Sequence, residues 1–267
     1  MAIRFFMVSF TAMLSAACST QATVTHSPQN DLALLWVNHA AEYGAITTQT
    51  YQSAAADLPR FLADTAWTAQ PGQYDVEGLP PAVILDVDET TISNARFQMA
   101  FERPMAQWKL EKWNDEHQSD PVPGVAQFVK AAQDAGVTVF FVTNRPCANR
   151  DNGPDPCPQK AETVRDIGEL GIETDVEHVL LANENGWDRA KIARREHIAQ
   201  THRIIMLFGD DLGDFMPCVR TKLYGPCTEP ATKQSRAQIV ADHRHLWGNG
   251  WYIVPGPMHG SWTSFTD

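Results

Sequence analysis

Residues 81–90 read PAVILDVDET, and this stretch decides the expected fold. Its apolar part, residues 82–85, is a short continuous run that is typical of a strand buried on both faces of a parallel sheet. Asp86 and Asp88 follow at the point where that strand should end. Side chains alternate along an extended backbone, so both carboxylates point the same way, with their Cα atoms about 7 Å apart. Open α/β sheets bind ligands at the carboxyl ends of their strands, so we expect a site here.

Two neighbouring carboxylates at such an edge offer a nucleophile and a general acid. We expect Asp86 to be the nucleophile, and Asp88 to protonate the leaving group and later deprotonate a water molecule. A divalent cation is needed beside them, because carboxylates at close range repel one another. The alternative is a turn that is acidic for local reasons, since Asp is common in turns at the ends of strands.

Strands and helices are expected to alternate along the rest of the chain. The predicted strands are residues 82–85, 137–143, 179–182, 203–209 and 251–254. The predicted helices are residues 30–64, 125–134, 159–170, 187–201 and 231–247. In the first helix we expect one side to carry Leu32, Leu35, Trp36, Ala40 and Tyr43. This order predicts an α/β fold with a doubly wound parallel sheet, an N-terminal helical region and a small helical insertion over residues 91–120.

Polar residues also follow the other predicted strands. Thr143 closes the second strand, and Asp210 and Asp214 come directly after a later one. Lys191 opens a basic helix between them. Because parallel strands end at a common edge, we expect all of these side chains to gather there. This convergence argues against the acidic-turn alternative more strongly than any single motif does.

Phosphomonoester hydrolysis fits these residue types. It requires an in-line nucleophile and positive charge on the equatorial phosphate oxygens. We predict that Asp86 forms an aspartyl-phosphate, and that the Thr143 hydroxyl, Asn144 and the Lys191 ammonium hold phosphate oxygens. Asp210, together with Asp86, is predicted to ligate Mg²⁺, whose preference for oxygen ligands these carboxylates satisfy.

Several charged neighbours have less defined roles. Asp211 or Asp214 is predicted to position metal-bound water or Lys191, and Asp211 is equally well explained as a helix-capping residue. Arg194 is interpreted as a solvated neighbour or a rival of Lys191. Arg145 either contacts phosphate or pairs with an acid, and we leave it out of the predicted site.

The sequence resembles a known family. Four motifs occur in order: DVDET at 86–90, FFVTNR at 140–145, Lys191, and GDDLGD at 209–214. These resemble the motifs of the haloacid dehalogenase superfamily. With the flanking stretches at 34–51 and 113–124, most of the mature chain is similar to the class C acid phosphatases, bacterial lipoproteins that act as 5′-nucleotidases. The resemblance implies Mg²⁺ as cofactor, with the Asp88 backbone carbonyl as a further metal ligand.

Substrate recognition is also implied by the resemblance. The family acts on nucleoside monophosphates and related phosphomonoesters, and clamps the base between aromatic side chains. The candidates here are Trp108, Trp113, His259 and Trp262. The spacing of the two tryptophans in the insertion differs from the family pattern, and His259 stands where a Tyr is expected. Base stacking is therefore a hypothesis.

The N-terminus resembles a bacterial lipoprotein signal. A short apolar core at residues 5–14 is too short to span a bilayer, and small residues lead to Cys18. We expect a signal peptide over 1–17, a lipidated Cys18 that begins a polar tether over 18–29, and a single acid phosphatase domain over 30–267. This predicts an outer membrane lipoprotein facing the periplasm or cell surface. The alternative is a soluble periplasmic or secreted protein.

Export accounts for the remaining cysteines, which are Cys147, Cys157, Cys218 and Cys227. An even number in an oxidising compartment indicates two disulfides. Three connectivities are open, and the spacing favours the local pairs Cys147–Cys157 and Cys218–Cys227.

Composition limits the partners. The 267 residues carry a net charge of −11 and no basic block, which argues against binding a nucleic-acid polymer or an anionic membrane by charge. We expect a small phosphomonoester substrate, membrane contact only through the lipid anchor, and a homodimer as an open option. Two other functions are considered: a phosphotransferase that uses the same intermediate, and a surface lipoprotein that binds haem or another ligand.

Overall fold

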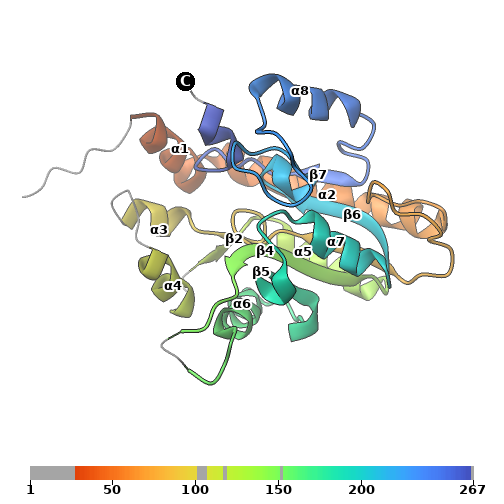
Figure 1. Ribbon diagram of the computed structural model, residues 1–267, viewed down its shortest axis with the longest axis horizontal. Coiled ribbons are helices and arrows are strands. Elements are labelled where there is room, and N and C mark those ends of the chain that lie inside the picture. The colour runs from red at the N-terminus through yellow and green to blue at the C-terminus, as the bar shows by residue number, and fades with distance from the viewer. Residues whose placement is uncertain (1–27, 101–106, 117–118, 151–152, 266–267) are drawn as a thin grey trace, which may run out of the picture.

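A five-stranded parallel sheet forms the centre of the protein (Figure 1). The computed structural model describes residues 28–100, 107–116, 119–150 and 153–265. The strand order is β5-β4-β1-β6-β7, and every neighbouring pair is parallel. The strands are β1 (Pro81–Leu85), β4 (Thr138–Pro146), β5 (Val179–Ala182), β6 (Arg203–Gly209) and β7 (Trp251–Ile253). The predicted fold class is confirmed, and the aspartate strand β1 is the central strand of the sheet.

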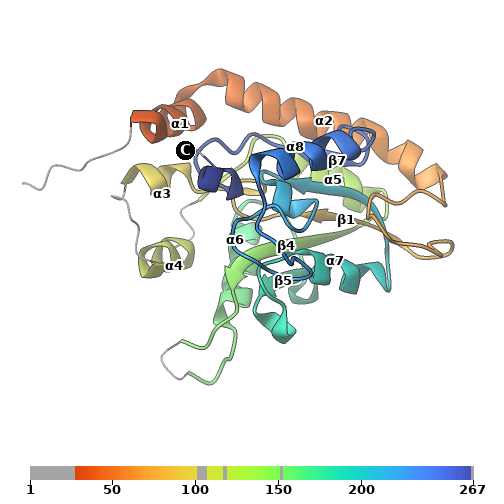
Figure 2. The same ribbon diagram turned by 45° about the horizontal axis from the view of Figure 1, so that its top comes forward.

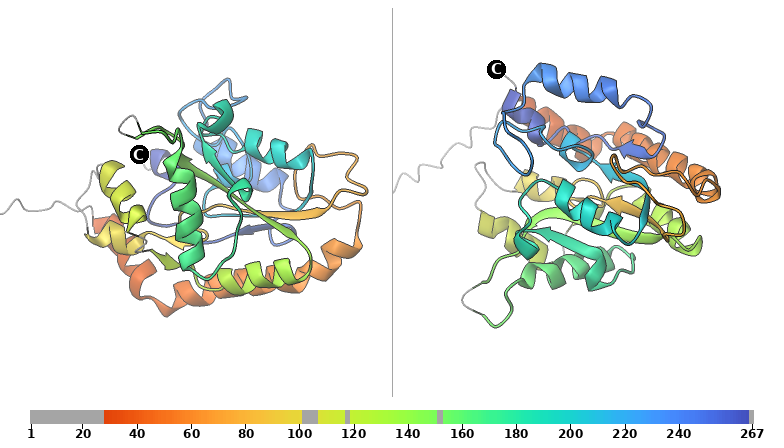
Figure 3. Two further views of the ribbon diagram at one scale, coloured as in Figure 1. Left: turned by 90° about the horizontal axis from the view of Figure 1, so that it is seen from below. Right: turned by 45° about the vertical axis from the view of Figure 1, so that its right-hand side comes forward.

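Alternation along β1 divides the core into two layers. Val83 and Leu85 belong to one apolar cluster, whereas Ala82 and Ile84 belong to another on the opposite face. The first cluster is covered by α2 (Ala41–Ala63), α5 (Val125–Asp134) and α6 (Pro158–Glu169). The second is covered by α7 (Ile192–Ala199) and by residues near β7. Figure 3 shows α2 and α5 on one side of the sheet and α7 on the other.

The N-terminal helical region is two helices, where one was predicted. The helix α1 (Pro28–His39) ends before Ala40, whose extended backbone separates it from α2. The helix thus begins within the segment predicted to be a tether. Figure 2 shows α1 and α2 along one side of the molecule, with α3 (Ala95–Ala100) beside α1.

The apolar side predicted for the first helix is only partly the side that is buried. Leu32 and Leu35 are 68% and 47% exposed, whereas the neighbouring Leu34 and Val37 are buried. The buried pair joins Tyr43, Ala95 and Met258 in a small apolar cluster. Packing against α3 and the C-terminal segment places Leu34 and Val37, and not Leu32 and Leu35, on the buried side of α1.

The predicted insertion begins and ends in a small antiparallel sheet. Strand β2 (Ile92–Ser93) pairs with β3 (Asp120–Pro121). Between them lie α3 and α4 (Gln107–Asp115). The ends of the segment are therefore held together next to the carboxyl edge of the large sheet.

Two predicted helices are shorter than expected. The helix α7 starts at Ile192 because the Asp188 carboxylate accepts a hydrogen bond from the Ala190 N–H (2.8 Å) and holds the preceding residues in a turn. The last helix, α8 (Lys233–Asp242), starts after the Thr232 cap and ends well before residue 247. Within the described residues, no helix has both the length and the apolar character needed to cross a bilayer.

Both local cysteine pairs are disulfides in the structure, Cys147–Cys157 and Cys218–Cys227. The predictions for residues 1–17 and for lipidation of Cys18 lie outside the described residues.

Candidate active site

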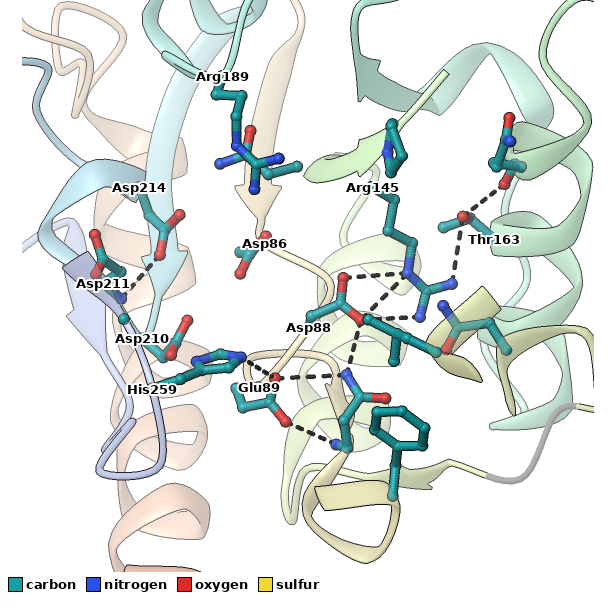
Figure 4. A pocket seen from close by; sticks show the side chains of 18 of the residues that line it. Asp86, Asp88, Glu89, Arg145, Thr163, Arg189, Asp210, Asp211, Asp214 and His259 are labelled. Atoms are coloured by element: carbon teal, nitrogen blue, oxygen red, sulfur yellow. Dashed lines mark hydrogen bonds and ion pairs between the residues drawn. The ribbon is translucent and has the colours of Figure 1, made fainter. Parts of the chain in front are cut away.

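A cavity of about 410 Å³ lies at the carboxyl edge of the sheet. Asp86 and Asp88 reach it from the end of β1, and Asp210 reaches it from the end of β6. Lys191, which precedes α7, and Asp214, in a short 3₁₀ turn (Leu212–Asp214), complete this part of the lining. Figure 4 shows the carboxylates pointing into the same space. The sheet therefore brings together the acids that the sequence placed after two different strands.

Three carboxylates form a group that is able to hold a metal ion. One oxygen from each of Asp86, Asp210 and Asp214 lies within 4.8 Å of the others. The Oδ2 atom of Asp210 is buried and has no hydrogen-bond partner among the described residues. A buried, unpaired carboxylate oxygen is costly, and a cation would relieve that cost. The donor set therefore fits a hard divalent cation.

Lys191 provides positive charge to this carboxylate group. Its ammonium hydrogen-bonds Asp86 Oδ1 and lies 2.7 Å from Asp214 Oδ1. Lys191 and Asp86 are both buried, so the ion pair is screened little by water. Asp214 also accepts a hydrogen bond from the Asp211 N–H (3.0 Å), which fixes its orientation toward Lys191.

One ammonium does not balance three carboxylates, and the pKa values reflect this. Burial raises the pKa of Asp86, Lys191 opposes that change, and Asp214 and Asp88 add to it, so that the pKa is about 7. Burial, together with Asp214 and Asp86, raises the pKa of Asp210 well above its usual range. Without a cation, the site therefore favours protonated carboxyl groups.

Asp88 lies in a different environment, although it is two residues from Asp86. Its carboxylate accepts hydrogen bonds from Arg145 Nε (3.1 Å to Oδ2), from Asn94 Nδ2 (2.8 Å to Oδ1) and from Thr143 Oγ1 (3.3 Å to Oδ2). Burial favours the neutral acid, but Arg145 and Asn94 stabilise the carboxylate and lower the pKa of Asp88. Figure 4 shows Asp88 directed toward Arg145 and away from the Asp210 side.

Arg145 is the residue that the sequence analysis left out. It ion-pairs with Asp88 (3.0 Å) and with Asp166 of α6, and it donates a hydrogen bond to Thr163 (3.3 Å). All of these partners are at least partly buried, so the guanidinium is fixed from two sides. Its position directly after Asn144, at the end of a strand that reaches the site, was the available signal.

Two of the predicted phosphate-binding residues, Thr143 and Asn144, lie at this end of β4. The Thr143 side chain is fully buried, and its hydroxyl accepts a hydrogen bond from the Arg145 N–H (3.1 Å) while donating to Asp88. Asn144 lines the cavity. Arg194 donates to the Asn144 side chain (2.8 Å) and to the Thr143 carbonyl. Arg194 is thus fully buried behind the site and is not a solvated neighbour.

Asp211 connects the C-terminal segment to the site. Its carboxylate caps the 3₁₀ turn through the Gly213 N–H (2.8 Å) and accepts hydrogen bonds from the Ser261 N–H and hydroxyl (2.9 Å for the hydroxyl). Of the two predicted roles, this geometry matches the capping role. In the same segment, Gly256 lies so close to Asp210 that a Cβ atom there would stand 2.3 Å from Asp210 Oδ2.

The aromatic candidates lie at different distances from the cavity. His259 lines it, and His259 Nε2 lies 3.1 Å from the buried carboxylate of Glu89. Trp113 packs against Phe97 at 5.6 Å and donates to Ser119 (3.0 Å), and it is not among the described lining residues. The side chain of Trp108 lies outside the described residues.

Trp262 is also absent from the described lining residues. Its indole N–H donates to the carbonyls of Gly256 (3.1 Å) and His259 (3.0 Å). Base stacking by any of the four aromatics stays a prediction, and His259 is the best placed of those described.

Comparison with known proteins agrees with this geometry. The family described as "HAD superfamily, subfamily IIIB (Acid phosphatase)" matches residues 7–262. The chain belongs to this family. The acid phosphatase is also similar to the solved class C acid phosphatase of Bacillus anthracis, with 27% identity, a TM-score of 0.70, and coverage of 88% of this chain and 86% of that one. A second structure of that Bacillus anthracis enzyme, with tungstate bound, matches with a TM-score of 0.71 at the same identity and coverage.

Family membership makes the chain a phosphomonoesterase. Carboxyl groups with raised pKa values in a cavity are typical of catalytic sites, so this cavity is the candidate active site of the acid phosphatase.

Proposed function

We propose that this phosphatase is an exported, Mg²⁺-dependent enzyme that hydrolyses nucleoside 5′-monophosphates through an aspartyl-phosphate on Asp86. The observation that carries the proposal is the buried group of Asp86, Asp210 and Asp214, with the Lys191 ammonium bound to two of the three. Tungstate is a tetrahedral oxyanion like phosphate, and its presence in the Bacillus anthracis relative supports a phosphate-sized anion in the equivalent cavity.

Asp86 and Asp210 would hold the cation, together with the Asp88 backbone carbonyl, and Asp214 would orient Lys191. When bound, Mg²⁺ supplies positive charge beside the phosphate oxygens. The unpaired Oδ2 of Asp210 supports this assignment, because it is buried with a free lone pair. The same charge would lower the pKa of Asp86 from about 7 and keep the nucleophile ionised.

The reaction then depends on the two aspartates of β1. A carboxylate oxygen of Asp86 would form a bond to phosphorus while the ester P–O bond breaks, and Asp88 would give a proton to the departing alkoxide. Asp88 would next take a proton from the water that cleaves the aspartyl-phosphate. Lys191, Asn144 and Thr143 would hold the phosphate oxygens throughout.

The preference for nucleotides is supported by the size and walls of the cavity. A volume of about 410 Å³ is within the range of small-molecule sites and exceeds the need of phosphate alone. The wall includes His259 and Phe97, whose rings are of the kind that bind bases.

Phosphate release tests the proposal directly. The full chain, with its disulfides intact, is incubated with adenosine 5′-monophosphate or with glycerol phosphate, in Mg²⁺ or in EDTA. We expect Mg²⁺-dependent release that is faster from the nucleotide. Equal rates for both substrates would remove the nucleotide preference but keep the phosphatase. Alkyl phosphate formed in the presence of an added alcohol would instead indicate a phosphotransferase.

Export as a lipoprotein needs its own test. The two disulfides support an oxidising compartment. In a Gram-negative host, the purified chain should carry a lipid mass at Cys18 that Cys18→Ser removes. Recovery of a chain cleaved near Ala22 without lipid would support the soluble alternative.

A further inference from the structure

Part of the cavity wall carries positive charge that the proposed reaction does not use. Arg189 and Arg220 both line the cavity, and both also line a smaller neighbouring pocket with Lys222. The two arginines therefore stand at the wall shared by the two hollows. This cationic wall, defined as Arg189, Arg220 and Lys222, is a local reversal in a chain whose net charge is −11.

Arg189 has a free charge. Its side chain is exposed, and it makes no hydrogen bond or ion pair with other residues in the described ranges. Figure 4 shows Arg189 pointing into the cavity on the side of Asp86. Other cavity arginines differ in this respect, since Arg145 is bound to Asp88 and Arg150 is paired with Glu162 at 2.8 Å.

The positive charge of Arg220 is only weakly neutralised by a neighbouring acid. Its nearest acid is Asp211, at 3.7 Å from Arg220 NH2 to Oδ1. That carboxylate already accepts hydrogen bonds from Gly213 and from the N–H and hydroxyl of Ser261. A long contact to a carboxylate with three other donors leaves the guanidinium able to bind a second anion.

The loops that carry these cations are fixed to one another. The Gly225 N–H donates to Asp188 Oδ2 (2.5 Å), and the Asp188 Oδ1 atom accepts from Ala190. Gly225 has a positive φ of 56°, and a Cβ atom there would lie 2.9 Å from the Cβ of Ala190. The Cys218–Cys227 disulfide closes the same loop. The separation of Arg189 from Arg220 is therefore set by the fold, as a binding site requires.

We propose that the cationic wall is a second anion subsite, which selects phosphomonoesters that carry a further phosphate group away from the bond being cleaved. This inference rests on the proposed function, because the scissile phosphate must lie over Asp86 for the second group to reach the wall. Arginine suits the task because its planar fork binds phosphate through two hydrogen bonds. The substrate class is a nucleoside bisphosphate, such as adenosine 3′,5′-bisphosphate.

The test compares two substrates with one enzyme. The ratio of kcat/KM for adenosine 3′,5′-bisphosphate to kcat/KM for adenosine 5′-monophosphate is measured in the wild type, Arg189→Gln, Arg220→Gln and the double variant. We expect the wild-type ratio to exceed one, and each single variant to lower it about tenfold, since a charge-assisted hydrogen bond contributes about that much. The wild-type ratio should also fall as salt is raised from 0.01 to 0.5 M, by about fivefold, because exposed charges are screened.

Arg244→Gln is the matched control. Arg244 is also exposed but lies outside the described cavity lining, so its loss should leave the ratio unchanged. An unchanged ratio in the double variant, with the monophosphate still hydrolysed, overturns the subsite and leaves the proposed function standing. An equal loss for both substrates in Arg189→Gln also overturns it, because the arginine would then act on the scissile phosphate. Hydrolysis of neither substrate by the wild type overturns the proposed function and the subsite together.

Discussion

Asp86 and Asp88 are two residues apart on one strand end, yet they lie in opposite electrostatic surroundings. Asp86 belongs to a group with more carboxylates than cations, and its pKa is raised to about 7. Asp88 is held by Arg145, Asn94 and Thr143, and its pKa is lowered. An enzyme that separates two pKa values in this way assigns different roles to chemically identical groups.

The pKa of Asp86 is raised whereas that of Asp88 is lowered, and these directions bear on the proposed roles of the two residues. In the proposed reaction Asp86 must be ionised and Asp88 must be protonated, and the pKa shifts of both residues favour the reverse. A cation beside Asp86 would favour its ionised form.

The largest expected effect tests the Asp86 side. Asp86→Asn removes the proposed nucleophile and should lower kcat by about 10⁴-fold or more, because the amide oxygen does not form an acyl phosphate. Phosphate release under saturating substrate measures it. Asp242→Asn, an exposed change on α8, is the control and should keep full activity. A residual rate in Asp86→Asn within tenfold of wild type would contradict the assignment.

Arg145 tests the Asp88 side. Arg145→Ala leaves Asp88 and the buried Asp166 without their shared cation, so we expect a loss of about 3 kcal/mol in the free energy of unfolding. Urea unfolding followed by circular dichroism measures the loss. Arg145→Lys should recover only part of it, since an ammonium lacks the planar fork that contacts both acids. Equal stability of Arg145→Ala and wild type would show that the pairing has no structural role.

A change at Arg194 tests whether the Asp86 side and the Asp88 side of the site are linked through the backbone at Thr143. Arg194→Met keeps much of the volume but removes the hydrogen bonds to the Thr143 carbonyl and the Asn144 side chain. We expect KM to rise about tenfold, with a loss of about 2 kcal/mol in stability, because buried acceptors are left unpaired. The exposed Arg244→Met is the control. A change in kcat alone would contradict a positioning role.

The smallest effect concerns stability against pH. In the metal-free protein the raised pKa values of Asp86 and Asp210 mean that the folded state binds more protons than the unfolded chain. The contribution of Asp86 therefore becomes less favourable as pH rises from about 4 to about 7, and that of Asp210 changes in the same direction. Mg²⁺ should raise the melting temperature by about 2–4 °C more at pH 7.5 than at pH 5. This difference corresponds to about 1 kcal/mol in the free energy of unfolding. A larger Mg²⁺-dependent rise in melting temperature at pH 5 would contradict the raised pKa values of Asp86 and Asp210.

Much of the fold could be predicted because its signals are local. Buried strands of continuous apolar residues gave β1, β5 and β6, and the amphipathic pattern of α5 gave its limits. The buried face of α1 was missed, since it depends on packing against α3 and residue Met258. The break at Ala40 was also missed. Propensity contains no information on such contacts.

The candidate site, like the fold, was predicted in part from local signals and missed where it depends on contacts between distant residues. Asp86 and Asp210 were found because strand ends in a parallel sheet share an edge. The sequence left Arg145 open between phosphate and an acid, and the structure pairs it with Asp88 and Asp166. The burial of Arg194 was missed, because an arginine has the same appearance in sequence whether it is solvated or buried against a carbonyl. The contact between Glu89 and His259 joins residues 170 positions apart, which no spacing rule reveals.

The C-terminal segment has a consequence for how the enzyme is made. Ser261 supports Asp211, and Gly256 packs on Asp210, so a segment near residue 260 completes a site that begins at residue 86. A chain that stops before residue 256 thus contains every acid of the site but lacks the contacts that support two of them. Synthesis of the acidic residues alone is therefore not enough to assemble the site, and the segment that follows β7 acts as the final component in its assembly.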